Sequence, residues 1–178
     1  MEYFNSRRVT RIGVAAALYF VLTVAPYTLS YNDLQFRLSE ALMLLCFFNK
    51  DYIIAMSMGC FIANLFSPMP IDILFGTVAT VAAAIPMYLL SKRGSLIRMV
   101  ICSLFPVISN TFIIALEMKI FMHMPYWISA AEIAVGEFVC VTLIGVALFS
   151  ILQKKRGLYE ICSIRKAAGK GVILQLIL

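Results

Sequence analysis

Six apolar segments, separated by short polar stretches, place the strongest limit on how this chain can fold. They cover residues 9–25, 35–48, 51–66, 71–90, 96–118 and 127–152. A helix that crosses a bilayer needs about 20 apolar residues. The second and third segments are shorter, so their ends must be buried in protein or face water. We therefore predict an all-α integral membrane protein: a six-transmembrane-helix bundle within residues 1–156, followed by a basic and apolar cytoplasmic tail at 157–178.

The composition and the placement of charge support this prediction. Hydrophobic residues make up 62% of the 178 residues and charged residues 13%, whereas soluble domains are about 45–50% apolar and about 25% charged. With the N-terminus inside, 13 of the 15 Lys and Arg residues fall in inner segments, and Arg37 and Lys119 fall outside. Cytoplasmic loops are enriched in positive charge. We therefore predict that both termini are cytoplasmic and that the net charge of +6 reflects topology rather than nucleic-acid binding.

Common catalytic and metal-binding motifs do not occur in the sequence. The five cysteines are widely spaced without a CxxC pair, and the single histidine, His123, falls in a predicted loop. HExxH, GxSxG and the phosphate-binding P-loop are also missing. We expect no metal, no catalytic residue and no cofactor held by this chain. A membrane-embedded enzyme is the weakest of the functional alternatives.

Strongly polar side chains gather in the outer halves of the predicted helices, while the inner halves are almost bare of them. The candidate ligand-binding residues are Glu137, Asn110, Glu40, Asn64, Arg37, Glu117, Glu132, Asp72 and, among the aromatic residues at the same end, Trp127. Ser103, Asn110 and Glu117 are seven residues apart, a spacing that keeps them on one helical face. Ionisable residues inside a membrane are costly and usually mark a functional site. The pattern predicts a polar pocket near the outer surface.

Some of these candidates also have a structural interpretation, which the sequence leaves open. Arg37 and Glu40, at i and i+3 on one helical face, either contact a ligand or form an ion pair that holds the short second helix. Asn64 and Asn110 either bind a ligand or form hydrogen bonds between helices, as polar residues do in membrane bundles.

The remaining candidates differ in how strongly they indicate a ligand. Trp127 suits an interfacial anchor, and Asp72 suits an acid at the start of a helix. Glu132 and Glu137 are five residues apart, so they point in different directions, one toward the pocket and the other toward a neighbouring helix. Glu137 lies deep in an apolar helix, which makes it the strongest candidate.

Four stretches of the sequence resemble one family of membrane transporters. They are LQFRLSEALMLLCFFN at 34–49, GCFIANLFSPMPIDILFGTVAT at 59–80, the SN pair at 109–110 with Glu117, and AVGEF at 134–138. Together these stretches resemble the queuosine-precursor transporter (QueT) family, whose members are substrate-binding S components of energy-coupling factor (ECF) transporters. The resemblance covers residues 9–152 and leaves the tail outside it.

The resemblance implies a location, a set of partners and a cargo. It implies a multi-pass protein of the bacterial cell membrane that works with a membrane coupling protein and two cytosolic ATPases, which use the ATP. It implies a 7-deazaguanine cargo such as preQ1 or queuine, captured near the outer face. S components dock through small residues of the first helix, and here the nearest match is Gly13, Ala16 and Ala17.

The chemistry of such a cargo agrees with the polar candidates. A deazaguanine offers N–H donors that suit a carboxylate, a carbonyl that suits Asn or Arg, and a flat face that suits aromatic rings. We expect Glu137 to take the donor edge. The main alternative is a stand-alone or differently specific carrier of a vitamin or nucleobase, although the chain lacks the repeated halves typical of secondary transporters. The sequence does not choose between preQ1, queuine and another vitamin-like heterocycle.

Overall fold

The computed structural model describes residues 6–30, 36–91 and 96–154, and all regular structure in these ranges is helical. The elements in chain order are α1 (Ser6–Val24), α2 (Tyr27–Ser30), η1 (Leu38–Phe47), α3 (Asp51–Asn64), α4 (Asp72–Leu90), α5 (Leu96–Phe121), α6 (Tyr126–Glu137), η2 (Phe138–Gly145) and α7 (Val146–Lys154). The predicted all-α fold is confirmed. The tail at 157–178 lies outside the described residues.

Prolines help to set where these helices end and begin. Pro26 follows α1 closely, and the residue before a proline disfavours the helical conformation. Pro125 precedes the first residue of α6. Pro86 and Pro106 instead lie inside α4 and α5, where packed neighbouring helices help to satisfy the backbone groups that a proline leaves free.

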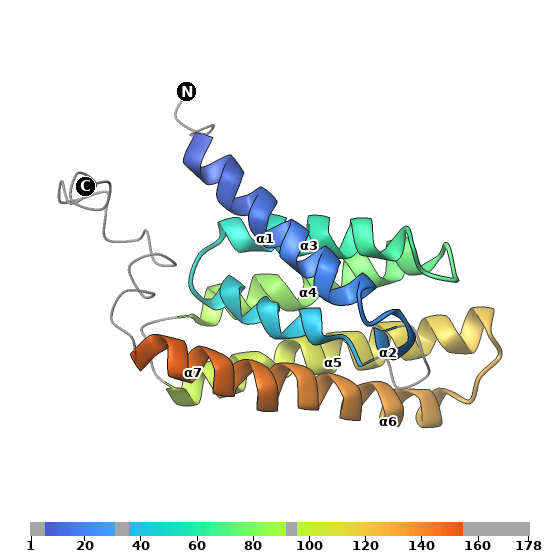
Figure 1. Cartoon of the computed structure of the whole chain (residues 1–178). Coiled ribbons are helices and arrows are strands. Elements are labelled where there is room, and N and C mark those ends of the chain that lie inside the picture. Colours follow the sequence, from blue (N-terminus) through green and yellow to red (C-terminus); the bar gives the residue numbers. More distant parts are fainter. Residues whose placement is uncertain (1–5, 31–35, 92–95, 155–178) are drawn as a thin grey trace, which may run out of the picture.

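The elements run back and forth along a bundle (Figure 1). α1 begins and α7 ends at the same end. At the opposite end, which we call the distal end, the chain passes from α1 to η1, from α3 to α4 and from α5 to α6. α6, η2 and α7 form one continuous rod, in which η2 is a stretch of π-helix. The rod begins and ends within a few residues of the predicted sixth segment.

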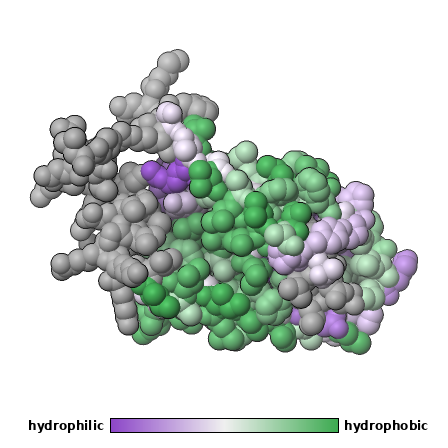
Figure 2. Space-filling view, viewed as in Figure 1, coloured by the Kyte–Doolittle hydropathy of each residue, from purple (hydrophilic) through white to green (hydrophobic). Residues whose placement is uncertain are grey.

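Three of the described helices are long and apolar enough to cross a membrane. These are Asp72–Leu90, Leu96–Phe121 and the continuous Tyr126–Ile151. Large apolar side chains cover much of the visible surface of the bundle (Figure 2). Exposing such an apolar surface to water is unfavourable, whereas contact between this surface and lipid is favourable. The chain is therefore a membrane protein, while six spans and two cytoplasmic termini stay predictions.

The short segment η1 lies inside the bundle. It packs against η2, α1, α4, α5 and α3. Eight of its ten residues are buried, which fits the expectation that this short segment is enclosed by protein. Its backbone is a 3₁₀-helix, and since such helices rarely exceed a few residues, we attribute its length to the packing around it.

Close contacts between small residues bring the helices together. A Cβ atom built at Gly59 on α3 would lie 2.8 Å from the Cβ of Tyr19 and 2.9 Å from the carbonyl oxygen of Ala16 on α1. At Gly145, a Cβ would lie 3.0 Å from Leu44 of η1. Small residues at helix interfaces allow this close approach in membrane proteins.

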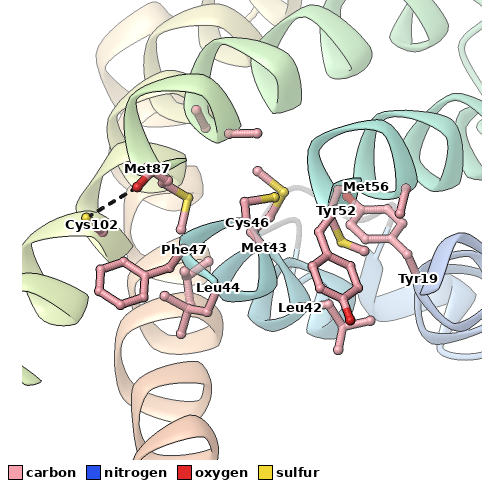
Figure 3. Packing of buried hydrophobic residues seen from close by; sticks show 14 of the residues in the cluster. Tyr19, Leu42, Met43, Leu44, Cys46, Phe47, Tyr52, Met56, Met87 and Cys102 are labelled. Carbon is pink, nitrogen blue, oxygen red and sulfur yellow. Dashed lines mark hydrogen bonds between the residues drawn. The ribbon is translucent and has the colours of Figure 1, made fainter. Parts of the chain in front are cut away.

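The main apolar core surrounds η1 and is rich in sulfur-containing and aromatic side chains (Figure 3). Met43 and Cys46 of η1 lie between Met87 of α4 and Met56 of α3. Cys102 of α5 donates a weak hydrogen bond to the Met87 carbonyl oxygen, with sulfur and oxygen 3.9 Å apart. The four described cysteines are free and buried, as expected for inert thiols in apolar helices.

Candidate ligand-binding site

Glu40 is buried near the start of η1 and is held by α1. Its side chain is 1% exposed. Oε1 accepts a hydrogen bond from the Tyr19 hydroxyl, and none of the described residues donates to Oε2. One turn along α1, Thr23 donates to the Ser39 hydroxyl at 2.6 Å. These two bonds fix the first turn of η1 against α1.

Glu137 is buried at the last residue of α6 and is held by α5. Its side chain is 2% exposed. The side-chain amide of Asn110 donates to Oε1 at 2.7 Å, while Oε2 receives no hydrogen bond within the described ranges. The π-helical stretch η2 begins at the next residue, and such stretches occur frequently at functional sites. The bond joins the two side chains that the sequence ranked highest.

Asn64 and Asp72 join α3 to α4 at the distal end. Asn64 is 1% exposed, and its Nδ2 donates to the backbone carbonyl of Asp72 at 2.9 Å, while its Oδ1 accepts no hydrogen bond from the part of the chain that the structure describes. The carboxylate of half-buried Asp72 accepts a hydrogen bond from Ser67. A Cβ at Gly76 would overlap with Asn64 Nδ2, so only glycine leaves room for this amide.

Arg37 is the positive charge beside these groups. Its side chain is buried, and its Nε donates to the carbonyl oxygen of Ser30 at 3.4 Å. A Cβ at Gly76 would lie 3.8 Å from Arg37 Nη1, which places the guanidinium beside the start of α4. The hydrogen bond found for Glu40 comes from Tyr19. Whether Arg37 and Glu40 contact the ligand or brace each other stays a prediction.

Glu117 is the third buried acid of this region. Its side chain is 1% exposed, and no N–H or hydroxyl group of the described residues donates to either carboxylate oxygen. Its charged neighbours are Asp72 and Arg37. The spacing prediction for α5 is confirmed, because Ser103, Asn110 and Glu117 are all buried.

These groups form one site, which we call the buried carboxyl cluster. Its members are Tyr19, Arg37, Glu40, Asn64, Asn110, Glu117 and Glu137, with Asp72 at its edge. Arg37 is the charged neighbour that Glu40, Glu117 and Glu137 share. Within the described part of the chain, each of these three acids keeps at least one carboxylate oxygen without a hydrogen-bond donor, and Asn64 keeps its carbonyl oxygen. Since burying an unpaired polar group is costly, the cluster is suited to a ligand rich in hydrogen-bond donors.

Other predicted site residues lie outside this cluster. Trp127 is 78% exposed and stacks edge-on against Tyr126, which suits the interfacial anchor rather than a ligand contact. Glu132 is half-buried and makes none of the recorded hydrogen bonds within the described ranges. Glu132 is half-buried whereas Glu137 is buried, which agrees with the prediction that the two side chains point in different directions around the helix.

The small residues of α1 divide between two faces. Gly13 and Ala17 are exposed, and a Cβ at Gly13 would meet nothing within 4 Å. Ala16 is buried, and its carbonyl oxygen approaches Gly59. Ala16 therefore serves packing within the bundle, and Gly13 and Ala17 are left for contact with lipid or a partner.

Tyr19 is the functional candidate that sequence reasoning missed. It lies within an apolar run on the first helix, where nothing distinguishes it from a packing residue. Figure 3 shows it extending from α1 toward Met56. Its hydroxyl is in contact with Glu40 only because η1 folds back along α1.

Two surface cavities lie away from the cluster. One, of about 730 Å³, is lined mainly by apolar residues of α4 and α5 and includes Lys119 and Tyr126. The other, of about 490 Å³, lies along α1 and includes Arg11 and Tyr52. In the part of the chain that the structure describes, no group of three His, Cys, Asp or Glu side chains is arranged to hold a metal ion.

The fold and the cluster together define a class: a helical membrane protein with a buried, acid-rich polar site between its helices. Comparison with known proteins gives the family. Residues 9–154 match the family described as QueT transporter. The chain is also 33% identical over 165 residues to the queuosine precursor transporter QueT of Lactococcus lactis subsp. cremoris (strain MG1363), covering 87% of this chain and 97% of that protein. No solved structure matches.

The chain therefore belongs to the QueT transporter family. The resemblance inferred from the SEAL, ANLFSP and AVGEF stretches is confirmed.

Proposed function

We propose that this chain is the substrate-binding membrane subunit of an ECF-type importer and captures a queuosine precursor, a 7-deazaguanine such as preQ1 or queuine. Family membership and the name of the Lactococcus lactis relative support a transporter of this cargo. We place the protein in the bacterial plasma membrane as a multi-pass subunit. ATP hydrolysis falls to partner ATPases, since the sequence lacks a P-loop.

The observation that carries this proposal is the surplus of unpaired acceptors in the buried carboxyl cluster. Five buried oxygens of the cluster accept no N–H or hydroxyl hydrogen bond from the described residues: Glu40 Oε2, Glu137 Oε2, Asn64 Oδ1 and both oxygens of Glu117. A deazaguanine is the complementary molecule, because its ring N–H and amino groups are donors and it carries a single ring carbonyl. Binding it would replace unsatisfied acceptors with charge-assisted hydrogen bonds, which are the stronger kind.

The geometry suggests how the cargo is oriented. Asn110 already occupies Oε1 of Glu137, so Oε2 is the oxygen left for the donor edge of the ring. We assign the ring carbonyl to the Arg37 guanidinium, which is the cation shared by the cluster. Tyr19 keeps the Glu40 carboxylate in place beside them.

We assign the coupling-protein contact to the exposed face of α1. Gly13 and Ala17 lie on this face four residues apart, and small residues at this spacing allow close helix packing in membranes. A membrane coupling protein and two cytosolic ATPases are the partners that this assignment requires.

Two experiments test the proposal. In the first, the purified chain is titrated with preQ1, queuine and guanine by isothermal titration calorimetry. Saturable binding of a deazaguanine in preference to guanine supports the cargo, and no binding of any deazaguanine refutes it. In the second, labelled cargo is followed in vesicles that contain the chain alone or with coupling protein and ATPases. Uptake only with the partners and ATP supports the subunit role, whereas uptake by the chain alone favours a stand-alone carrier.

A further inference from the structure

Glu117 and Asp72 form an acidic pair set apart from the contacts that hold Glu40 and Glu137. Among the described residues, no N–H or hydroxyl group donates to either carboxylate oxygen of Glu117, although the side chain is buried. Asp72, its charged neighbour, lies at the first residue of α4 and is held by Ser67. Beside Asp72, the buried carbonyl oxygen of Asn64 likewise accepts no hydrogen bond within the described ranges. These three acceptors are complementary to a ligand group that carries several donors.

Acidic side chains outnumber cationic ones around this pair. Within the described residues, Glu40, Glu117, Glu137 and Asp72 share Arg37 as their cationic neighbour. Lys119, two residues beyond Glu117, is exposed and lies over the Tyr126 ring at 6.0 Å, and residues two apart do not share a helical face. A nearby cation stabilises the ionised forms of two neighbouring carboxyl groups.

An organic amine is the kind of ligand cation that suits these acceptors. No group of three metal-ligating side chains is present among the described residues, so the pair offers few ligands to a metal ion. An ammonium group carries three N–H donors, which matches the unpaired oxygens of Glu117 and Asn64. Asn110 and Glu117 are seven residues apart on one face of α5, or about 10 Å along the axis. A bicyclic ring held at Asn110 and Glu137, with a short aminomethyl arm, spans this length together with its hydrogen bonds.

We propose that Glu117, with Asp72, is the specificity determinant that selects deazaguanines bearing a cationic aminomethyl arm over those with a neutral substituent. This inference rests on the proposed function, since it requires the ring to bind at Glu137 and Asn110. The proposal adds a second subsite, at the distal end of α4 and α5, that recognises the substituent rather than the ring.

The test compares two ligands that differ in charge at one position. Purified full-length chain is titrated with 7-aminomethyl-7-deazaguanine and with 7-cyano-7-deazaguanine, in the wild type and in Glu117→Gln. The wild type should bind the amine about 10- to 100-fold more tightly than the nitrile, because only the amine forms a hydrogen bond between charged groups. In Glu117→Gln this ratio should fall to about 3-fold or less, chiefly through weaker binding of the amine.

Two further variants keep the test decisive. Asp51→Asn removes the same charge at the opposite end, where Asp51 pairs with Arg8 at 2.5 Å, and should leave the ratio unchanged. If Glu117→Gln does not fold, Asp72→Asn, at a half-buried position, should lower the ratio in the same direction. Equal affinity for both ligands in the wild type, or an unchanged ratio in the variants, overturns the inference while leaving the proposed function intact. Failure of both ligands to bind the wild type overturns both.

Discussion

Replacing Glu137 with glutamine should separate cargo binding from folding. In the native site Asn110 Nδ2 donates to Glu137 Oε1 at 2.7 Å. A glutamine at this position must turn its carbonyl oxygen toward Asn110 to keep that bond. Its NH₂ group then takes the place of Oε2, the oxygen that has no partner in the structure. The variant would present a donor to the donor edge of the ring.

The size of the effect follows from the bond that is lost. A hydrogen bond to a charged group contributes about 1.5–3 kcal/mol, so Glu137→Gln should weaken cargo binding about 10- to 150-fold. Its free energy of unfolding should not fall, because the Asn110 bond survives and a buried charge is removed. Calorimetry of the purified chain measures the cargo affinity, and thermal unfolding in detergent measures the stability of the fold.

Glu137→Ala provides the contrast. It removes the acceptor of Asn110 and leaves a cavity, so it should lose cargo binding and also destabilise the fold by about 2–4 kcal/mol. Cargo affinity within 3-fold of wild type in Glu137→Gln would refute the role given to Glu137 Oε2. Equal destabilisation by glutamine and alanine would show that the side chain serves packing alone.

Three further predictions concern the helices that hold the site. Gly59→Ala should destabilise the chain by about 1–3 kcal/mol in thermal unfolding, because its Cβ would lie 2.8 Å from the Tyr19 Cβ. Gly13→Ala is the matched control, and it should leave the stability unchanged because its Cβ would lie in open space. Gly76→Ala should displace the Asn64 amide and weaken cargo binding at least about 10-fold by calorimetry, and unchanged affinity would contradict this. Tyr19→Phe removes the donor to the buried carboxylate of η1 and should lower the free energy of unfolding by about 1–3 kcal/mol; a neutral effect would show that this bond contributes nothing.

The helical framework and the spacing along α5 could be predicted from the sequence. Hydrophobic length and proline positions locate the helices to within a few residues. Seven-residue spacing placed Ser103, Asn110 and Glu117 on one face, and all three are buried. These features depend on local periodicity, which a single sequence contains.

Contacts between distant segments could not be predicted in the same way. The Tyr19 hydroxyl bonds with Glu40 across 21 residues, and a tyrosine in an apolar run carries no local signal of this. The 3₁₀ backbone of η1 likewise depends on its neighbours in the bundle. The sequence leaves Trp127 between a ligand contact and an interfacial anchor, and its 78% exposure agrees with the anchor.

The central claim is that the buried carboxyl cluster holds a queuosine precursor. Native mass spectrometry of the chain purified from cells supplied with preQ1 tests it most directly. The account predicts one bound deazaguanine per chain, identified by its mass after release, and its loss in Glu137→Gln. A wild-type chain that carries no deazaguanine, or a Glu137→Gln chain that retains it fully, would contradict the account.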